Sequence, residues 1–337
     1  MHSNKIVSRW LLTIMSLIVL IIIVGGITRL TNSGLSMPFW DLIEILPPLN
    51  ESEWMDKFEE YKRYPDYRNQ TIEEFKSIYW WEYIHRIIGR IIGMVALFPF
   101  IYFIYKKYLT NKEKKDYAII LFLILIQGVV GLMMVKSGLN PSIYNKAQGV
   151  SPFWLLVHLI LALLTYSYAL LQYLKLNNST LINLKYKGFN FGSLIFTVIL
   201  FQIMLGALMS GFKAGYLYQS FPLMDGQFYP SKATLLNFNN PHFIHFFHRW
   251  FAFLLFAIVV GSFFKLKDIL SESQIFIFRA LFYTFIFQII FGIFSVLNPV
   301  IPFAGSIDSI VIALIHQIGS IVLISLGVIL AFSFSNK

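Results

Sequence analysis

Eight long apolar stretches recur along the sequence, and they restrict the folds open to this chain more than any other feature. Each is close to the roughly 20 residues that an α-helix needs to cross a bilayer. They lie at about 10–28, 79–103, 117–135, 153–174, 190–210, 242–264, 277–297 and 308–332. Only 13% of the 337 residues are charged, about half the share found in soluble domains. The sequence therefore predicts an all-α integral membrane protein with eight transmembrane helices.

The basic residues between the apolar stretches predict an orientation. Lys and Arg are enriched in the short cytoplasmic connections of membrane proteins. They are concentrated in the two terminal tails and in the connections at 104–116, 175–189 and 265–279, and they are sparse at 136–151, 211–240 and 298–307. We therefore expect both termini in the cytoplasm and a multi-pass protein of the inner (cytoplasmic) cell membrane. Because topology accounts for the net charge of +10, we expect no nucleic-acid partner.

The connection at about 29–78 is the longest one. Asn50 and Thr71 each stand three residues before a glutamate, which is the spacing of a capping box. The two boxes predict two short amphipathic helices. The first would carry an apolar stripe at helical spacing, made of Trp54, Phe58 and Tyr61. We expect this connection to lie as a lid on the outer membrane surface.

Motifs of the first half of the chain recur in the second half. The matching positions are His85-Arg86 with His248-Arg249, His158 with His316, and Gln127/Gly131 with Gln288/Gly292. The Gln-xxx-Gly motif occurs a third time, at Gln202/Gly206. Duplication of a four-helix unit is the simplest explanation. It predicts two pseudo-symmetric four-helix bundles, at 1–175 and 176–337. We interpret the Gln-xxx-Gly motifs as helix packing, with the amide bonding across helices.

Four histidines occupy these matched positions. In the predicted topology they lie at one depth, roughly 10 Å below the outer surface. A single histidine of this kind could simply be hydrogen-bonded in the core, but intramembrane ionisable residues are costly and tend to be functional. Two facing imidazoles suit the axial positions of heme iron, whereas zinc prefers three or four protein ligands. With no cysteine in the chain, the pattern favours one heme between His85 and His158 and another between His248 and His316.

Charged residues near these histidines suggest further roles. Arg86, Arg90 and Arg249 within helices, and Arg29 at the end of the first stretch, are candidate partners for heme propionates. Snorkelling to lipid headgroups is the alternative.

Glu82 lies on the same helix face as His85. No acid precedes His248 in this way, so we expect proton chemistry at the first pair and electron transfer at the second. An ion pair between Glu82 and Arg86 or Arg90 is the simpler alternative. We expect His245 to be a hydrogen-bond donor behind the ligand and His242 to be incidental.

Several longer motifs carry a resemblance to a known family. They are GGITRLTNSGLSM at 25–37, LPPL at 46–49, EYIHRIIGRIIG at 82–93, QGVVGLMMVKSGL at 127–139, AGYLYQSFPLM at 214–224, FFHR at 246–249 and HQIGS at 316–320. Over about 10–330 the chain resembles heme A synthase, in particular the mitochondrial-type branch with a long first outer loop and no cysteine pair. His245 departs from the resemblance, because a glutamine is expected there.

The resemblance implies an enzyme that oxidises the C8 methyl of heme O to the formyl group of heme A for terminal oxidases. It assigns His85 and His158 to the substrate heme, His248 and His316 to a cofactor heme b, and catalysis to Glu82. The implied partners are heme O, membrane lipid and an unidentified electron-transfer protein, with heme O synthase and oxidase assembly factors as further candidates. Self-association is left open.

Two other functions remain open at this point. A diheme electron-transfer cytochrome would need no Glu82 and would leave its heme chemically unchanged. A heme carrier would exchange its heme readily.

Overall fold

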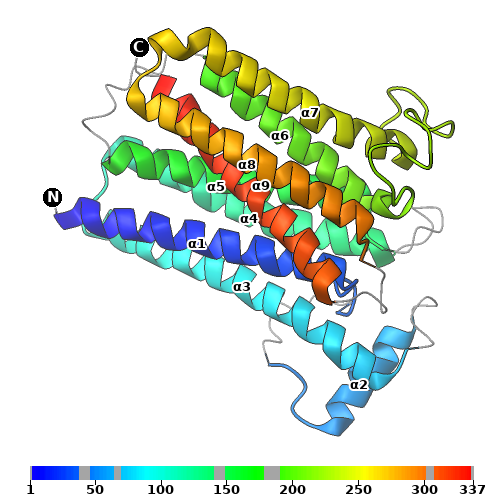
Figure 1. Ribbon diagram of the computed structural model, residues 1–337. Coiled ribbons are helices and arrows are strands. Elements are labelled where there is room, and N and C mark those ends of the chain that lie inside the picture. Colours follow the sequence, from blue (N-terminus) through cyan, green and yellow to red (C-terminus); the bar gives the residue numbers. More distant parts are fainter. Residues whose placement is uncertain are drawn as a thin grey trace. The chain divides into compact units, whose positions relative to one another are not determined.

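The fold consists of long α-helices (Figure 1). A computed structural model describes residues 2–37, 46–63, 70–139, 149–177, 190–300 and 307–334. Within these ranges eight helices are long and apolar enough to cross a membrane, which confirms the predicted fold class. They are α1 (His2–Leu30), α3 (Ile72–Tyr105), α4 (Asn111–Leu139), α5 (Pro152–Asn177), α6 (Phe191–Gly211), α7 (Pro241–Leu266), α8 (Glu272–Leu297) and α9 (Ile307–Phe334).

The chain forms two compact units. One consists of Ser16–Ala162, and the other of Met1–Met15 together with Leu163–Lys337. His85 and His158 belong to the first unit, which we call the N-terminal unit. His248 and His316 belong to the second, the C-terminal unit. The predicted pseudo-symmetry and the cytoplasmic termini stay predictions.

In its described residues, the long first connection contains one short helix, α2 (Glu51–Lys62). Asn50 caps it by accepting a hydrogen bond from the Glu53 N–H at 2.9 Å, as the sequence predicts. The prediction of a second short helix is wrong, because the Thr71 capping box lies at the start of α3. Neither glycine nor proline occurs between Thr71 and Gly89, so nothing separates this start from the apolar stretch.

An aromatic cluster holds α2 against the beginning of α3. Trp54, Phe58 and Tyr61 of α2 are buried against the first turns of α3, where they contact Phe75, Ile78 and Tyr79. The ring centroids of Tyr61 and Phe75 are 4.9 Å apart. Burial of this size contributes a few kcal/mol per aromatic side chain, so α2 is a packed part of the N-terminal unit. Its predicted place on the membrane surface stays a prediction.

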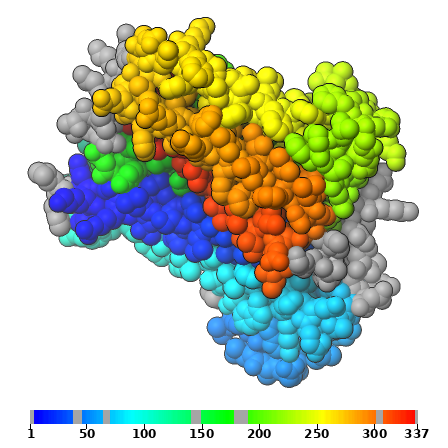
Figure 2. Space-filling model, viewed as in Figure 1, coloured from blue at the N-terminus to red at the C-terminus, as the bar shows by residue number. Residues whose placement is uncertain are grey.

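Close backbone approach organises the C-terminal unit. A Cβ built on Gly192 of α6 would lie 2.6 Å from the Ala331 Cα atom of α9, so only glycine allows this approach. Asn190, which caps α6, donates to the Ala331 carbonyl at 3.1 Å. The short helix η2 (Ala214–Tyr216) follows the C-terminal end of α6. A second short helix, η3 (Lys267–Ile269), follows α7. The connection after η2 forms a compact cap beside the N-terminal end of α7 (Figure 2).

Candidate functional site

The four matched histidines face each other in two pairs. In the N-terminal unit the ring centroids of His85 and His158 are 6.4 Å apart, with an angle of 51° between the ring planes. In the C-terminal unit the centroids of His248 and His316 are also 6.4 Å apart, at an angle of 90°. All four side chains are only partly buried. The structure therefore brings together the histidines that the sequence pairs.

The spacing of each pair fits one iron atom between two imidazoles. A metal–imidazole bond is about 2 Å long, so two rings on opposite sides of one metal have centroids about 6 Å apart. Within the residues that the structure describes, no group of three or more His, Asp or Glu side chains is close enough together to hold a metal ion. The ligand set present there is two imidazoles per unit, which suits the axial positions of heme.

Each histidine ring lies against a glycine of the membrane helix that precedes it. A Cβ built on the glycine would come within 3.0 or 3.1 Å of the ring, for Gly25 with His85, Gly131 with His158, Gly206 with His248 and Gly292 with His316. Any larger residue would displace the imidazole. The sequence predicted helix packing at three of these glycines. It did not predict that each glycine faces the ring of a ligand histidine.

Glutamine amides hold two of the histidines. Gln127 Nε2 donates to the His158 carbonyl at 2.8 Å and lies 3.2 Å from its Nδ1. Gln202 Nε2 makes the same contacts with His248, at 3.0 and 3.1 Å. The predicted amide bonding across helices is thus confirmed at both motifs.

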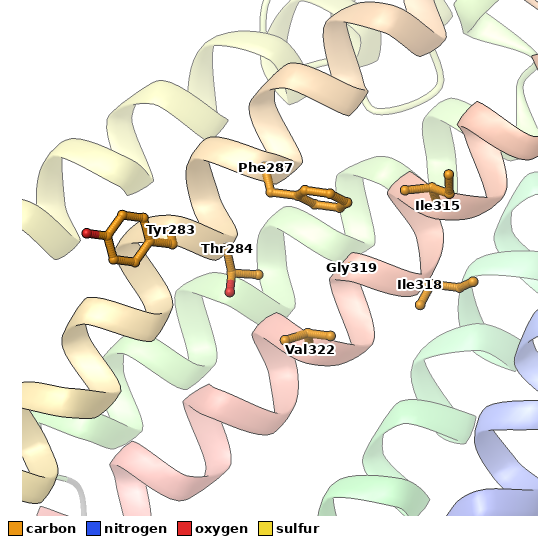
Figure 3. A pocket seen from close by; sticks show the side chains of 7 residues that line it. All are labelled: Tyr283, Thr284, Phe287, Ile315, Ile318, Gly319 and Val322. Atoms are coloured by element: carbon orange, nitrogen blue, oxygen red, sulfur yellow. The ribbon is translucent and has the colours of Figure 1, made fainter.

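The third glutamine of this pattern is arranged differently. The amide nitrogen of Gln288 lies against Gly319, where a Cβ would sit 1.8 Å from it. That nitrogen has no hydrogen-bond partner in the described part of the chain, and His316 interacts with the backbone of Gln288 and not with its amide. Figure 3 shows Gly319 beside Phe287 at an apolar groove between α8 and α9, which is further lined by Tyr283, Thr284, Ile315, Ile318 and Val322.

Glu82 is buried at the centre of a polar cluster, with 3% of its surface exposed. Its Oε2 accepts from the Ser36 hydroxyl at 2.8 Å and from the Met37 N–H at 2.9 Å. Its Oε1 accepts from Arg86 Nη2 at 2.5 Å, and the same nitrogen donates to the Met37 carbonyl at 2.5 Å. The ion pair with Arg86 therefore exists within α3. The hydrogen bonds to Ser36 and Met37 join α3 to the chain that follows α1.

His245 holds the corresponding position in the C-terminal unit, three residues before His248. It is completely buried, and its Nε2 accepts from Arg249 Nε at 2.8 Å. The sequence suggested a donor at this position, and His245 also makes a hydrogen bond with the Ala214 backbone. Arg249 also donates to the carbonyls of Ser220 and Tyr218, at 2.7 and 2.8 Å.

His242 contacts the connection between α6 and α7. The sequence did not predict this contact. The hydroxyl of Tyr218 lies 2.7 Å from His242 Nδ1. Burial, reinforced by the charge of Asp225, raises the pKa of the Tyr218 phenol, so the hydroxyl remains protonated at neutral pH. His242 therefore links α7 to the connection that contains Tyr218.

The helices and the two histidine pairs together define a multi-pass membrane protein with two paired-histidine centres. The chain belongs to the cytochrome oxidase assembly protein family, COX15-CtaA, whose model matches residues 8–328. It is 38% identical to the heme A synthase of Pelagibacter ubique (strain HTCC1062) over 351 aligned positions, which cover 98% of this chain and 97% of the relative. It is 37% identical to the heme A synthase of Rickettsia africae (strain ESF-5), with 96% of both chains covered. The family resemblance is thereby confirmed, and membership of the mitochondrial-type branch stays a prediction.

Replacing Arg249 with methionine should loosen the connection around Tyr218. The variant loses two hydrogen bonds from a charged donor to backbone carbonyls, so amide hydrogen exchange in residues 214–224 should become about tenfold faster. Arg279→Met is the matched control, because Arg279 is exposed on α8. Equal exchange rates in both variants would show that Arg249 does not restrain this segment.

Proposed function

We propose that this chain is an enzyme that oxidises the C8 methyl group of heme O to the formyl group of heme A. Relatives carrying the name heme A synthase align with nearly the whole chain. The observation that carries the proposal is structural. Two histidine pairs have the same spacing, but among the described residues only His85 has a buried carboxylate one helical turn away. One pair is thus equipped for proton chemistry and the other is not.

His85 and His158 would hold the iron of the substrate heme. His248 and His316 would hold a resident heme b, which supplies one-electron redox chemistry when bound. The glycines beside the four rings let each imidazole approach the preceding membrane helix closely. Electrons removed from the methyl group would leave through the C-terminal unit to a redox partner, which makes the reaction an oxidoreductase reaction on a CH group.

With water as the source of the oxygen atom, oxidation of the methyl group through the alcohol to the aldehyde releases four protons and four electrons. Glu82 would accept these protons and pass them on one at a time. Arg86 donates a hydrogen bond to the buried carboxylate and places an opposite charge beside it. Proton uptake would then require the Arg86 contact to lengthen. The Ser36 hydroxyl and the Met37 N–H would keep the carboxylate in place during that change.

Several finer assignments belong to the same proposal. Arg29, Arg86, Arg90 and Arg249 are the candidate partners of the heme propionates, and the three nitrogens of Arg249 already hold its own unit together. The protein would reside in the inner cell membrane with both termini in the cytoplasm. Heme O synthase and oxidase assembly factors are candidate partners.

The test is heme extraction and mass analysis from cells that make heme O but no heme A. Expression of the chain should produce heme A or its hydroxymethyl precursor, and cells without the chain should produce neither. Only unchanged heme O and heme B, from a well-folded preparation, would instead favour an electron-transfer cytochrome or a heme carrier.

Replacing Glu82 with glutamine should lower heme A formation by about a hundredfold, because general acid–base groups typically contribute factors of this size. The amide keeps the shape of the side chain but neither carries the charge nor takes up the proton. Glu73→Gln is the control, since Glu73 is exposed on the same helix. Heme A production at the normal rate in the Glu82 variant would remove the catalytic role from this residue.

Replacing His316 with alanine should abolish the six-coordinate heme b spectrum of the purified protein, because one of two axial ligands is lost. The visible absorption of the reduced protein measures this directly. His242→Ala should keep the spectrum, since His242 contacts Tyr218 and not the pair. An unchanged heme b spectrum in the His316 variant would contradict the ligand assignment.

A further inference from the structure

The four histidine ligands are not held alike, and the difference lies in the helix that precedes each one. In α4, α6 and α8 the glycine that faces the ring stands four residues after a glutamine. In α1 the residue four positions before Gly25 is Ile21. Spacing of four residues places both members of each motif on one helix face. His85 is therefore the one ligand whose preceding helix lacks the amide.

Ile21 occupies the position where the other helices carry the glutamine. It packs against an apolar cluster that includes Ile88 and Ile92 of α3. Its Cδ1 would lie 3.6 Å from a Cβ built on Gly89, one turn beyond His85. An isoleucine side chain has no hydrogen-bond donor, so α1 cannot make the bond to the ligand residue that Gln127 and Gln202 make.

The His85 ring is also turned differently. It presents Nε2 and Cδ2 to Gly25, at 3.1 and 3.4 Å from the built Cβ. The other three rings present Cε1 first, at 3.0 or 3.1 Å, with both nitrogens further away at 3.6 to 3.8 Å. Two independent observations, the missing amide and the ring orientation, thus single out the same histidine.

We propose that Gln127 and Gln202 are positioning residues that keep one axial imidazole firmly in place in each unit, and that Ile21 leaves His85 as the exchangeable ligand of the N-terminal unit. This inference rests on the proposed function. A substrate heme must enter and its product must leave in every cycle, so both bonds from iron to histidine must break each time, and the less firmly held histidine would leave first. A resident heme needs no such release.

Carbon monoxide binding tests the proposal without measuring turnover. The full-length chain, loaded with heme and reduced, is mixed with carbon monoxide, which binds ferrous iron only when an axial ligand has left. The N-terminal heme should bind it. The C-terminal heme should not, because the Gln202 amide holds His248 and the Gln288 backbone holds His316. Ile21→Gln supplies the missing amide and should slow binding about fivefold, equivalent to about 1 kcal/mol. Ile21→Met, similar in length but without a donor, should leave the rate unchanged.

The reverse substitution gives a second readout. Gln202→Met removes the amide that holds His248, so the C-terminal heme should begin to bind carbon monoxide while the α-band of its carbon monoxide-free form stays that of a bis-histidine heme. Equal binding at both hemes of the unaltered chain would overturn the proposal. So would an equal effect of Ile21→Gln and Ile21→Met, which would indicate packing and not hydrogen bonding.

The heme content of the same preparation separates this inference from the proposed function. A chain that binds heme at His248 and His316 alone, even with heme O supplied, overturns the proposed function and the exchange proposal with it. A chain that binds heme in both units but shows the same carbon monoxide behaviour at each overturns only the exchange proposal.

Discussion

Everything at the two histidine centres depends on the cost of leaving a polar group without a partner inside a membrane. Both units meet this constraint in the same way. An arginine directly follows the first ligand and binds an acceptor one turn earlier, Glu82 with Arg86 and His245 with Arg249. Each arginine also donates to backbone carbonyls of the chain outside its helix. The polar cluster thereby positions the ligand helix and the neighbouring connection together.

The two clusters differ in charge. In the N-terminal unit the arginine is neutralised by a carboxylate, and in the C-terminal unit it meets an imidazole acceptor. A buried ion pair is costly to assemble, and removing one member leaves an uncompensated charge. Such a pair is weak evidence for stability alone, so its presence beside only one histidine pair supports the proposed division between oxidation chemistry and electron transfer.

The sequence predicted the features that depend on pattern and missed those that depend on contact across helices. Hydropathy was sufficient for the eight spans, and the repeated positions were sufficient to pair the histidines. The Thr71 capping box looked like the start of a separate helix because a local motif marks where a helix begins, not how far it runs. The partner of His242 was missed because Tyr218 lies in another segment, and no periodicity connects the two.

The glycines beside the histidine rings also bear on how the protein is made. Each ligand ring lies against the membrane helix synthesised just before its own: α1 before α3, α4 before α5, α6 before α7 and α8 before α9. Chains enter the membrane from the N-terminus onward, and their units fold as they emerge. The glycine that each imidazole packs against is thus already in the membrane when that imidazole is inserted. A nascent chain can therefore position each ligand as soon as the two helices of a pair are in the membrane.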